Sequence, residues 1–138
     1  MSIVATTTAR IILGIIFIAH GWQKFFTNGI GATADGFKQM GVPAPTLSAW
    51  FSALVELVGG AALVIGLAVP VFAVLLILNM LGALFMVHLE NGFFAASGGY
   101  ELVLALIAGL IAVGFTNQGA ASVDGNILRA RQQRTVSA

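Results

Sequence analysis

The sequence predicts an all-α integral membrane protein, a bundle of four transmembrane helices. The 138-residue chain is 59% hydrophobic and only 8% charged, and its mean hydropathy is +1.00. About a quarter of the residues in a soluble domain are charged. Four mainly apolar segments approach the length of about 20 residues that a helix needs to cross a bilayer. The chain is long enough for one domain, which we expect to cover residues 1–138.

The first expected span covers about residues 8–26 and starts beside Arg10. We expect it to be retained rather than cleaved as a signal peptide. Signal peptidase needs small residues at its cleavage site, whereas the bulky Trp22, Gln23 and Lys24 stand near the end of this segment.

The connection over residues 28–46 is the longest in the chain. Thr33 or Asp35 is expected to cap a one-turn helix at the membrane surface, and Gly41 would end that helix. Pro43 and Pro45 then impose extended backbone before the second span.

The second and third spans are expected at about residues 47–67 and 71–89, joined by a tight connection at Pro70. The fourth, at about residues 100–115, is short. A polar tail over about residues 120–138 follows it, and we expect that tail to be partly helical.

The distribution of Lys and Arg predicts the orientation, because cytoplasmic segments carry more of these residues. Four cations lie near the chain ends and two lie in the opposite connections. These are Arg10, Arg129, Arg131 and Arg134 against Lys24 and Lys38. We therefore expect both termini in the cytoplasm and the bundle in the cell membrane.

Several classes of function find no support in the composition. The net charge is +1 and there is no basic tract, so nucleic acid is not an expected partner. The chain has no Cys, so it carries no disulfide, thiolate metal site or iron–sulfur cluster of its own. It also has no phosphate-binding glycine loop and no His-Glu-x-x-His motif.

Six polar side chains form the candidate ligand-binding site, because the predicted topology places all of them in the outer half of the bundle. With a helical rise of 1.5 Å per residue, Glu56 lies roughly 15 Å below the outer rim, near the midplane, and Asn79 reaches a similar depth. An acid at that depth faces the bundle interior and marks a functional site by default. The six residues are Glu56, His20, Glu101, His88, Lys24 and Asn79.

Helix geometry decides which of these side chains can meet. His20 and Lys24 are four residues apart and share a face. His88 and Asn79 are nine residues apart and lie on opposite faces of an ideal helix, so only one of them is expected to point fully inward. Glu101 shares its face with small residues that predict a packing stripe, namely Ala105, Ala108 and Ala112.

Other interpretations stay open at this point. Glu56 could be a neutral carboxyl that only holds two helices in register, bonded to backbone or to Asn79. Lys24 could extend to the membrane interface. Haem ligation by His20 and His88 is disfavoured because nothing indicates room for the ring between them. No metal is expected from those histidines and Glu101, because they lack motif spacing.

The order and spacing of several short motifs resemble those of DoxX family membrane proteins over nearly the full length of the chain. The matching motifs are His20-Gly21-x-x-Lys24, Gly41-x-Pro43-x-Pro45, Glu56-x-x-Gly59-Gly60 with Gly66, Met80-x-x-Ala83 leading to His88, Gly92-Phe93-Phe94, Gly98-Gly99-Tyr100-Glu101 and Ser122-Val123-Asp124. The stretch 114–119 departs from the Gly-x-Gly pattern that often precedes the terminal Ser-x-Asp.

The resemblance implies a four-helix membrane bundle and a link to redox chemistry, since family members are commonly labelled membrane oxidoreductases. Our first hypothesis is a membrane subunit of a redox complex that binds a quinone or a small metabolite in the outer polar pocket. Any electron carrier would come from a partner protein or a bound ligand. The second hypothesis is a membrane anchor that recruits an enzyme and does no chemistry. A small-solute transporter is the third; with four spans per chain it would require a homo-oligomer.

Overall fold

The computed structural model describes residues 1–137, and this part of the chain is helical with no β-strand. The six α-helices are α1 (Ile3–Trp22), α2 (Gly29–Gln39), α3 (Pro45–Ile65), α4 (Val69–Ala83), α5 (Glu101–Gly114) and α6 (Val123–Val136). Two π-helical segments, Gln23–Thr27 and Leu84–His88, continue α1 and α4. Two 3₁₀ turns, Leu89–Asn91 and Ala95–Ser97, lie between α4 and α5.

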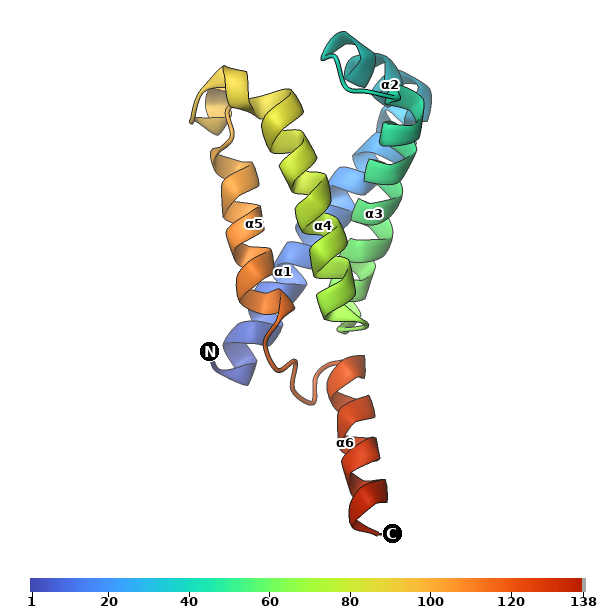
Figure 1. Ribbon diagram of the computed structural model, residues 1–138, viewed down its shortest axis with the longest axis vertical. Helices are drawn as coiled ribbons and strands as arrows, with labels where there is room; N and C mark the ends of the chain where they lie inside the picture. The colour runs from blue at the N-terminus through green and yellow to red at the C-terminus, as the bar shows by residue number, and fades with distance from the viewer. Residues whose placement is uncertain (138) are drawn as a thin grey trace.

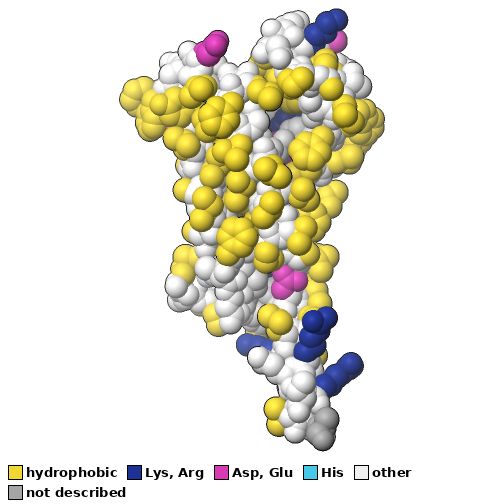
Figure 2. All heavy atoms as spheres, in the orientation of Figure 1, with side chains coloured by type: hydrophobic (Ala, Val, Ile, Leu, Met, Phe, Trp, Pro, Cys, Tyr) yellow, Lys and Arg dark blue, Asp and Glu magenta, His cyan; other side chains and the backbone are white. Residues whose placement is uncertain are grey.

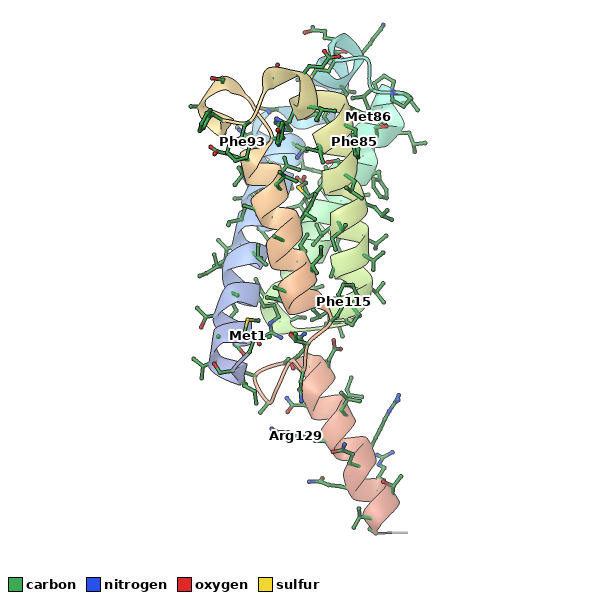
Figure 3. All side chains as sticks on the ribbon, turned by 60° about the vertical axis from the view of Figure 1, so that its left-hand side comes forward. Met1, Phe85, Met86, Phe93, Phe115 and Arg129 are labelled. Atoms are coloured by element: carbon green, nitrogen blue, oxygen red, sulfur yellow. The ribbon has the colours of Figure 1, made fainter. Side chains whose placement is uncertain are left out.

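Four helices form a closed bundle in which α1 packs on α3, α3 on α4, α4 on α5, and α5 on α1 (Figure 1). The end with α2 and the α4–α5 connection is called the cavity end below. The opposite end, with the α3–α4 turn and the start of α6, is called the tail end. Met1 and Phe115 mark the tail end, Phe85, Met86 and Phe93 mark the cavity end, and α6 with Arg129 extends beyond the bundle (Figure 3).

The hydropathy of the helices confirms a multi-pass membrane bundle. Three helices are long and apolar enough to cross a bilayer, Ile3–Thr27, Pro45–Ile65 and Val69–Asn91, while α5 is a shorter apolar helix. Large hydrophobic side chains cover much of the visible surface of the bundle (Figure 2). A soluble protein rarely exposes so continuous an apolar surface, whereas a lipid environment favours it. The helices therefore contact the bilayer.

Glycines set the closest helix contact, between α1 and α3. A Cβ on Gly60 would lie 2.7 Å from the carbonyl oxygen of Gly14, and one on Gly21 would lie 2.7 Å from the backbone nitrogen of Leu57. No larger residue fits there without moving a backbone. Small residues at this contact therefore allow α1 and α3 to approach closely beside Glu56.

The connection before α3 differs from the sequence-based expectation in its helix and in the backbone between its two prolines, where Ala44 is left-handed, with φ +45°, rather than extended. The helix in the first connection is not one turn long: α2 has 11 residues, and Thr33 lies inside it, bonded to the carbonyl oxygens of Gly29 and Lys24. These bonds join α2 to the π-helical end of α1, so the helix starts earlier than the capping pattern indicated. Gly41, with φ +77°, does follow its end as expected.

The prediction of a packing stripe on the α5 face that carries Glu101 is also wrong. Ala105, Ala108 and Ala112 are exposed, and the buried face of α5 consists of Val103, Leu106, Leu110 and Val113 instead. Branched side chains fill the bundle interior better than alanine does. The alanine stripe therefore points out of the bundle.

The tail end is held by a network around the start of α6. Ser122 caps α6 by accepting a hydrogen bond from the backbone N–H of Gly125. The carboxylate of Asp124 accepts from the N–H groups of Ala68 and Val69 at 2.8 and 2.9 Å. The expected turn or cap at residues 122–125 is thus present, and it also closes the start of α4.

Candidate functional site

A large cavity lies at the cavity end, between the α1–α3 pair and the α4–α5 pair. Its volume is about 730 Å³, within the range of small-molecule sites. Most of its lining is apolar, and its polar side chains are His20, Lys24, Ser48, Ser52, Glu56, Asn79 and His88. Figure 2 shows a hollow at this end in which a Lys or Arg side chain is visible below a rim of hydrophobic side chains.

Glu56 lies at the centre of the polar group. It is only 2% exposed, and its two carboxylate oxygens have different partners. Lys24 Nζ donates to Oε2 at 2.6 Å, and Asn79 Nδ2 donates to Oε1 at 3.0 Å. One buried negative charge is thus matched by one positive charge from α1 and one neutral donor from α4. The Lys24 side chain therefore extends inward to Glu56 rather than outward to the membrane interface.

The two π-helical segments position the side chains that ideal helices would misplace. A π-helical turn holds one more residue than an α-helical turn, so it rotates all later side chains around the helix axis. In the segment Leu84–His88 this rotation brings His88 to the same cavity as Asn79. The expectation that only one of them faces inward was therefore wrong. Lys24 lies in the other π segment. Such segments are rare, and they often occur at functional sites.

The hydrogen bonds of both histidines fix which ring nitrogen carries the proton. His20 Nδ1 bonds to the carbonyl oxygen of Ile16 at 2.9 Å, and His88 Nδ1 bonds to that of Gly98 at 2.7 Å. A carbonyl oxygen can only accept, so Nδ1 is the donor in each case. In the neutral ring Nε2 then has a free lone pair. Each histidine therefore offers a proton acceptor at the cavity.

Glu101 is the one candidate that does not line the cavity. Its Oε1 accepts a hydrogen bond from the backbone N–H of Ala95 at 2.9 Å, and its own N–H donates to the carbonyl oxygen of Phe93. It therefore holds the α4–α5 connection in shape. Gly98, whose carbonyl receives His88, belongs to the same connection. In the described part of the chain, residues 1–137, no three His, Asp or Glu side chains form a metal-binding group.

Ser52 is a cavity residue that the sequence analysis missed. Ser48, Ser52 and Glu56 follow one another at intervals of four residues, so they form one row on α3. All three line the cavity, and Ser52 is 6% exposed. Ser48 donates to the carbonyl oxygen of Pro43. The four-residue spacing leading to the buried acid was the available signal.

The site as a whole combines hydrogen-bond donors and acceptors with no net charge. Lys24 and Glu56 neutralise each other, and Lys24 and Asn79 each have further N–H groups beyond those bonded to Glu56. The two histidines supply acceptors, and Ser52 can do either. Such a set of donors and acceptors can bond the carbonyl or hydroxyl oxygens of an uncharged ligand.

Comparison with known proteins agrees with this architecture. The sequence model of the DoxX family matches residues 5–89, which include every candidate residue except Glu101. The Bacillus subtilis protein named "Putative oxidoreductase CatD" is 31% identical over 98% of this chain and 96% of its own length. An uncharacterized membrane protein of Mycobacterium tuberculosis is 30% identical over 83% of this chain and 76% of its own. No solved structure matches. The chain belongs to the DoxX family of membrane proteins.

Proposed function

We propose that this protein is the membrane subunit of a redox complex and that its cavity binds the head group of a quinone. The observation that carries the proposal is the neutral set of donors and acceptors around Glu56 inside a largely apolar cavity. The name of the Bacillus subtilis relative supports redox chemistry as the setting. The chain has no Cys, so electrons would come from a partner protein of the complex.

The polar side chains suit both states of such a ligand. Lys24 and Asn79 have N–H groups that can donate to the carbonyl oxygens of a quinone. Reduction to the quinol adds a hydrogen to each of these oxygens, and the Nε2 atoms of His20 and His88 can then accept hydrogen bonds from the hydroxyl groups. The same nitrogens can carry the protons that are exchanged during the reaction. Glu56 acts by holding Lys24 and Asn79 in place.

The direct test is quinone binding by the purified protein in lipid nanodiscs. The main variant is Lys24→Met/Glu56→Gln, which removes both charges together and so leaves no unpaired buried charge. The matched control is Lys38→Met, because Lys38 is exposed and does not line the cavity. We expect the double variant to lose at least about tenfold in affinity for a naphthoquinone. Equal affinity in all three proteins would refute the proposal.

The orientation forms part of the proposal. Arg129, Arg131 and Arg134 lie on α6 at the tail end, whereas Lys38 is at the cavity end and Lys24 is paired with Glu56. This difference supports both termini in the cytoplasm and a location in the cell membrane. A C-terminal tag should therefore be protected in intact cells. A tag that is accessible from outside the cell would show that the protein has the opposite orientation.

A membrane anchor is the second candidate, and α6 is the observation that favours it. This helix extends beyond the bundle (Figure 1). It carries three exposed arginines. If recruitment is the function, removal of residues 123–138 would abolish cellular activity and Glu56→Gln would leave it intact. The redox-subunit proposal expects Glu56→Gln to abolish activity while the protein still accumulates in the membrane.

A further inference from the structure

The cavity has an apolar rim and a polar floor. Large hydrophobic side chains of α3, α4 and α5, of the π-helical segment Leu84–His88 and of the residue that follows α2 line the cavity and are also exposed at the molecular surface. These are Met40 (44%), Leu47 (70%), Phe51 (46%), Leu78 (55%), Met86 (47%) and Leu102 (45%). Glu56, at 2% exposed, is the most deeply buried polar side chain of the lining. A rim of this kind costs free energy in water and none in hydrocarbon.

Gly82 interrupts this rim on α4. Leu78, Gly82 and Met86 are spaced by four residues, and all three line the cavity, so Gly82 replaces a side chain between two large exposed ones. A Cβ on Gly82 would meet no atom within 4 Å. In the spanning helices α1, α3, α4 and α5 of the described chain, every other glycine would bring its Cβ against a neighbouring side chain or backbone. Gly82 is therefore not required for close helix packing, and it leaves a gap between the side chains of Leu78 and Met86.

The gap lies on the side of α4 that faces α3. Asn79, three residues before Gly82, donates a hydrogen bond to Glu56 of α3, and a Cβ on Gly59 of α3 would lie 3.2 Å from the side chain of Leu76. Residues three apart on a helix are neighbours, so Gly82 lies about one turn beyond the Asn79–Glu56 bond toward the cavity end. On α3, the row of cavity-lining residues that leads to Glu56 consists of the small side chains Ser48 and Ser52, while Leu47 and Phe51 belong to the exposed rim. Gly82, with open space beside it, thus lines the same cavity as Lys24 and Glu56 of the buried ion pair.

We propose that Gly82 forms a lateral portal between α3 and α4, through which a membrane-borne quinone enters head first from the bilayer and its apolar tail remains in the lipid. The inference rests on the proposed function and specifies its ligand as a quinone with a hydrocarbon tail. The polar head lies against Lys24, Asn79 and the histidines. The tail passes between Leu78 and Met86, where an exposed apolar rim borders the missing side chain.

The test compares two probes in nanodiscs, a prenylated naphthoquinone and the same ring with a methyl group in place of the tail. Gly82→Leu fills the portal, and its Cβ falls in open space, so the fold should be kept. Gly31→Leu is the matched control, because Gly31 is a helical glycine that also has no neighbour within 4 Å but does not line the cavity. Gly82→Ala adds only one methyl group and gives a milder second variant.

We expect Gly82→Leu to weaken binding of the prenylated probe by at least about tenfold and binding of the methyl probe by less than about threefold. Gly82→Ala should fall between wild type and Gly82→Leu, and Gly31→Leu should match wild type. Equal affinities of wild type and Gly82→Leu for the prenylated probe would overturn the portal and leave the proposed function standing. Equal loss of both probes in Gly82→Leu would also overturn it. If neither probe binds the wild type, the proposed function itself fails.

Discussion

The two ends of the bundle each bury one charged side chain, but the hydrogen-bond partners of the two charges differ. At the cavity end Glu56 is 2% exposed, and both of its oxygens are bonded, to Lys24 and to Asn79. At the tail end Arg10 is fully buried, and its Nη2 donates to the carbonyl oxygen of Ala121 at 2.7 Å. Arg10 Nε and Nη1 have no hydrogen-bond partner within the described residues, 1–137.

The two charges also differ in how closely they are packed. The ion pair at the cavity end borders a cavity of about 730 Å³. Arg10 is packed so closely that a Cβ on Gly66 would overlap its Nη1, and Asp124 holds the adjacent α3–α4 turn. A paired charge beside open space can meet a ligand, whereas a charge enclosed by backbone can only join segments. We infer that the cavity end serves binding and that Arg10 serves to fix the tail.

Removal of one member of the ion pair should have the largest effect on stability. Lys24→Met leaves the buried carboxylate of Glu56 without its cation, and such a change costs about 3 kcal/mol or more. The double variant Lys24→Met/Glu56→Gln should recover more than half of this loss. Equilibrium unfolding in detergent measures both values. A Lys24→Met protein as stable as wild type would show that the pair does not hold the cavity end together.

Replacement of Arg10 should have a smaller effect on the free energy of unfolding, despite its complete burial. Arg10→Met loses the hydrogen bond to Ala121, but it also removes a charge whose other nitrogens lack partners. We expect a loss of about 1 kcal/mol or less together with faster amide exchange over residues 115–122. Hydrogen exchange with mass spectrometry checks this local effect. A loss as large as that of Lys24→Met would remove the distinction between the two ends.

Two serines give the finest comparison, because they are almost equally buried. Ser122, at 4% exposed, caps α6 and donates to the carbonyl oxygen of Gly119, so Ser122→Ala should cost about 1 kcal/mol. Ser52, at 6% exposed, lines the cavity, so Ser52→Ala should change stability by less than about 0.5 kcal/mol. It should nevertheless weaken naphthoquinone binding several-fold. Thermal unfolding with and without the ligand separates the two effects, and a reversed order would contradict the assignment of the ends.

Much of the fold follows from hydropathy. The four apolar segments appear as helices within a few residues of their expected positions, although the first begins at Ile3 rather than near Thr8. The depth of Glu56 follows from its place near the middle of its span, and its bond to Asn79 agrees with their similar depths. The depths of the two residues are local properties, because a helix has a fixed rise per residue, whereas the bond between them is a tertiary contact.

The composition of the candidate site could be predicted only in part. Five of the six candidates line one cavity, and Glu101 instead holds the α4–α5 connection. The positions of Lys24 and His88 depend on π-helical segments, for which the sequence gives no recognisable signal. Ideal α-helical geometry put His88 and Asn79 on opposite faces, whereas both line the cavity.

The sequence by itself determined the membrane class, the spans and the depth of the buried acid, because hydrophobic length and helical rise depend only on neighbours along the chain. Only the tertiary structure decided that Lys24 of α1 and Asn79 of α4 meet Glu56 of α3, and that Gly82 has open space beside it. These features depend on how helices rotate and diverge when they pack. That rotation is set by contacts between residues far apart in sequence.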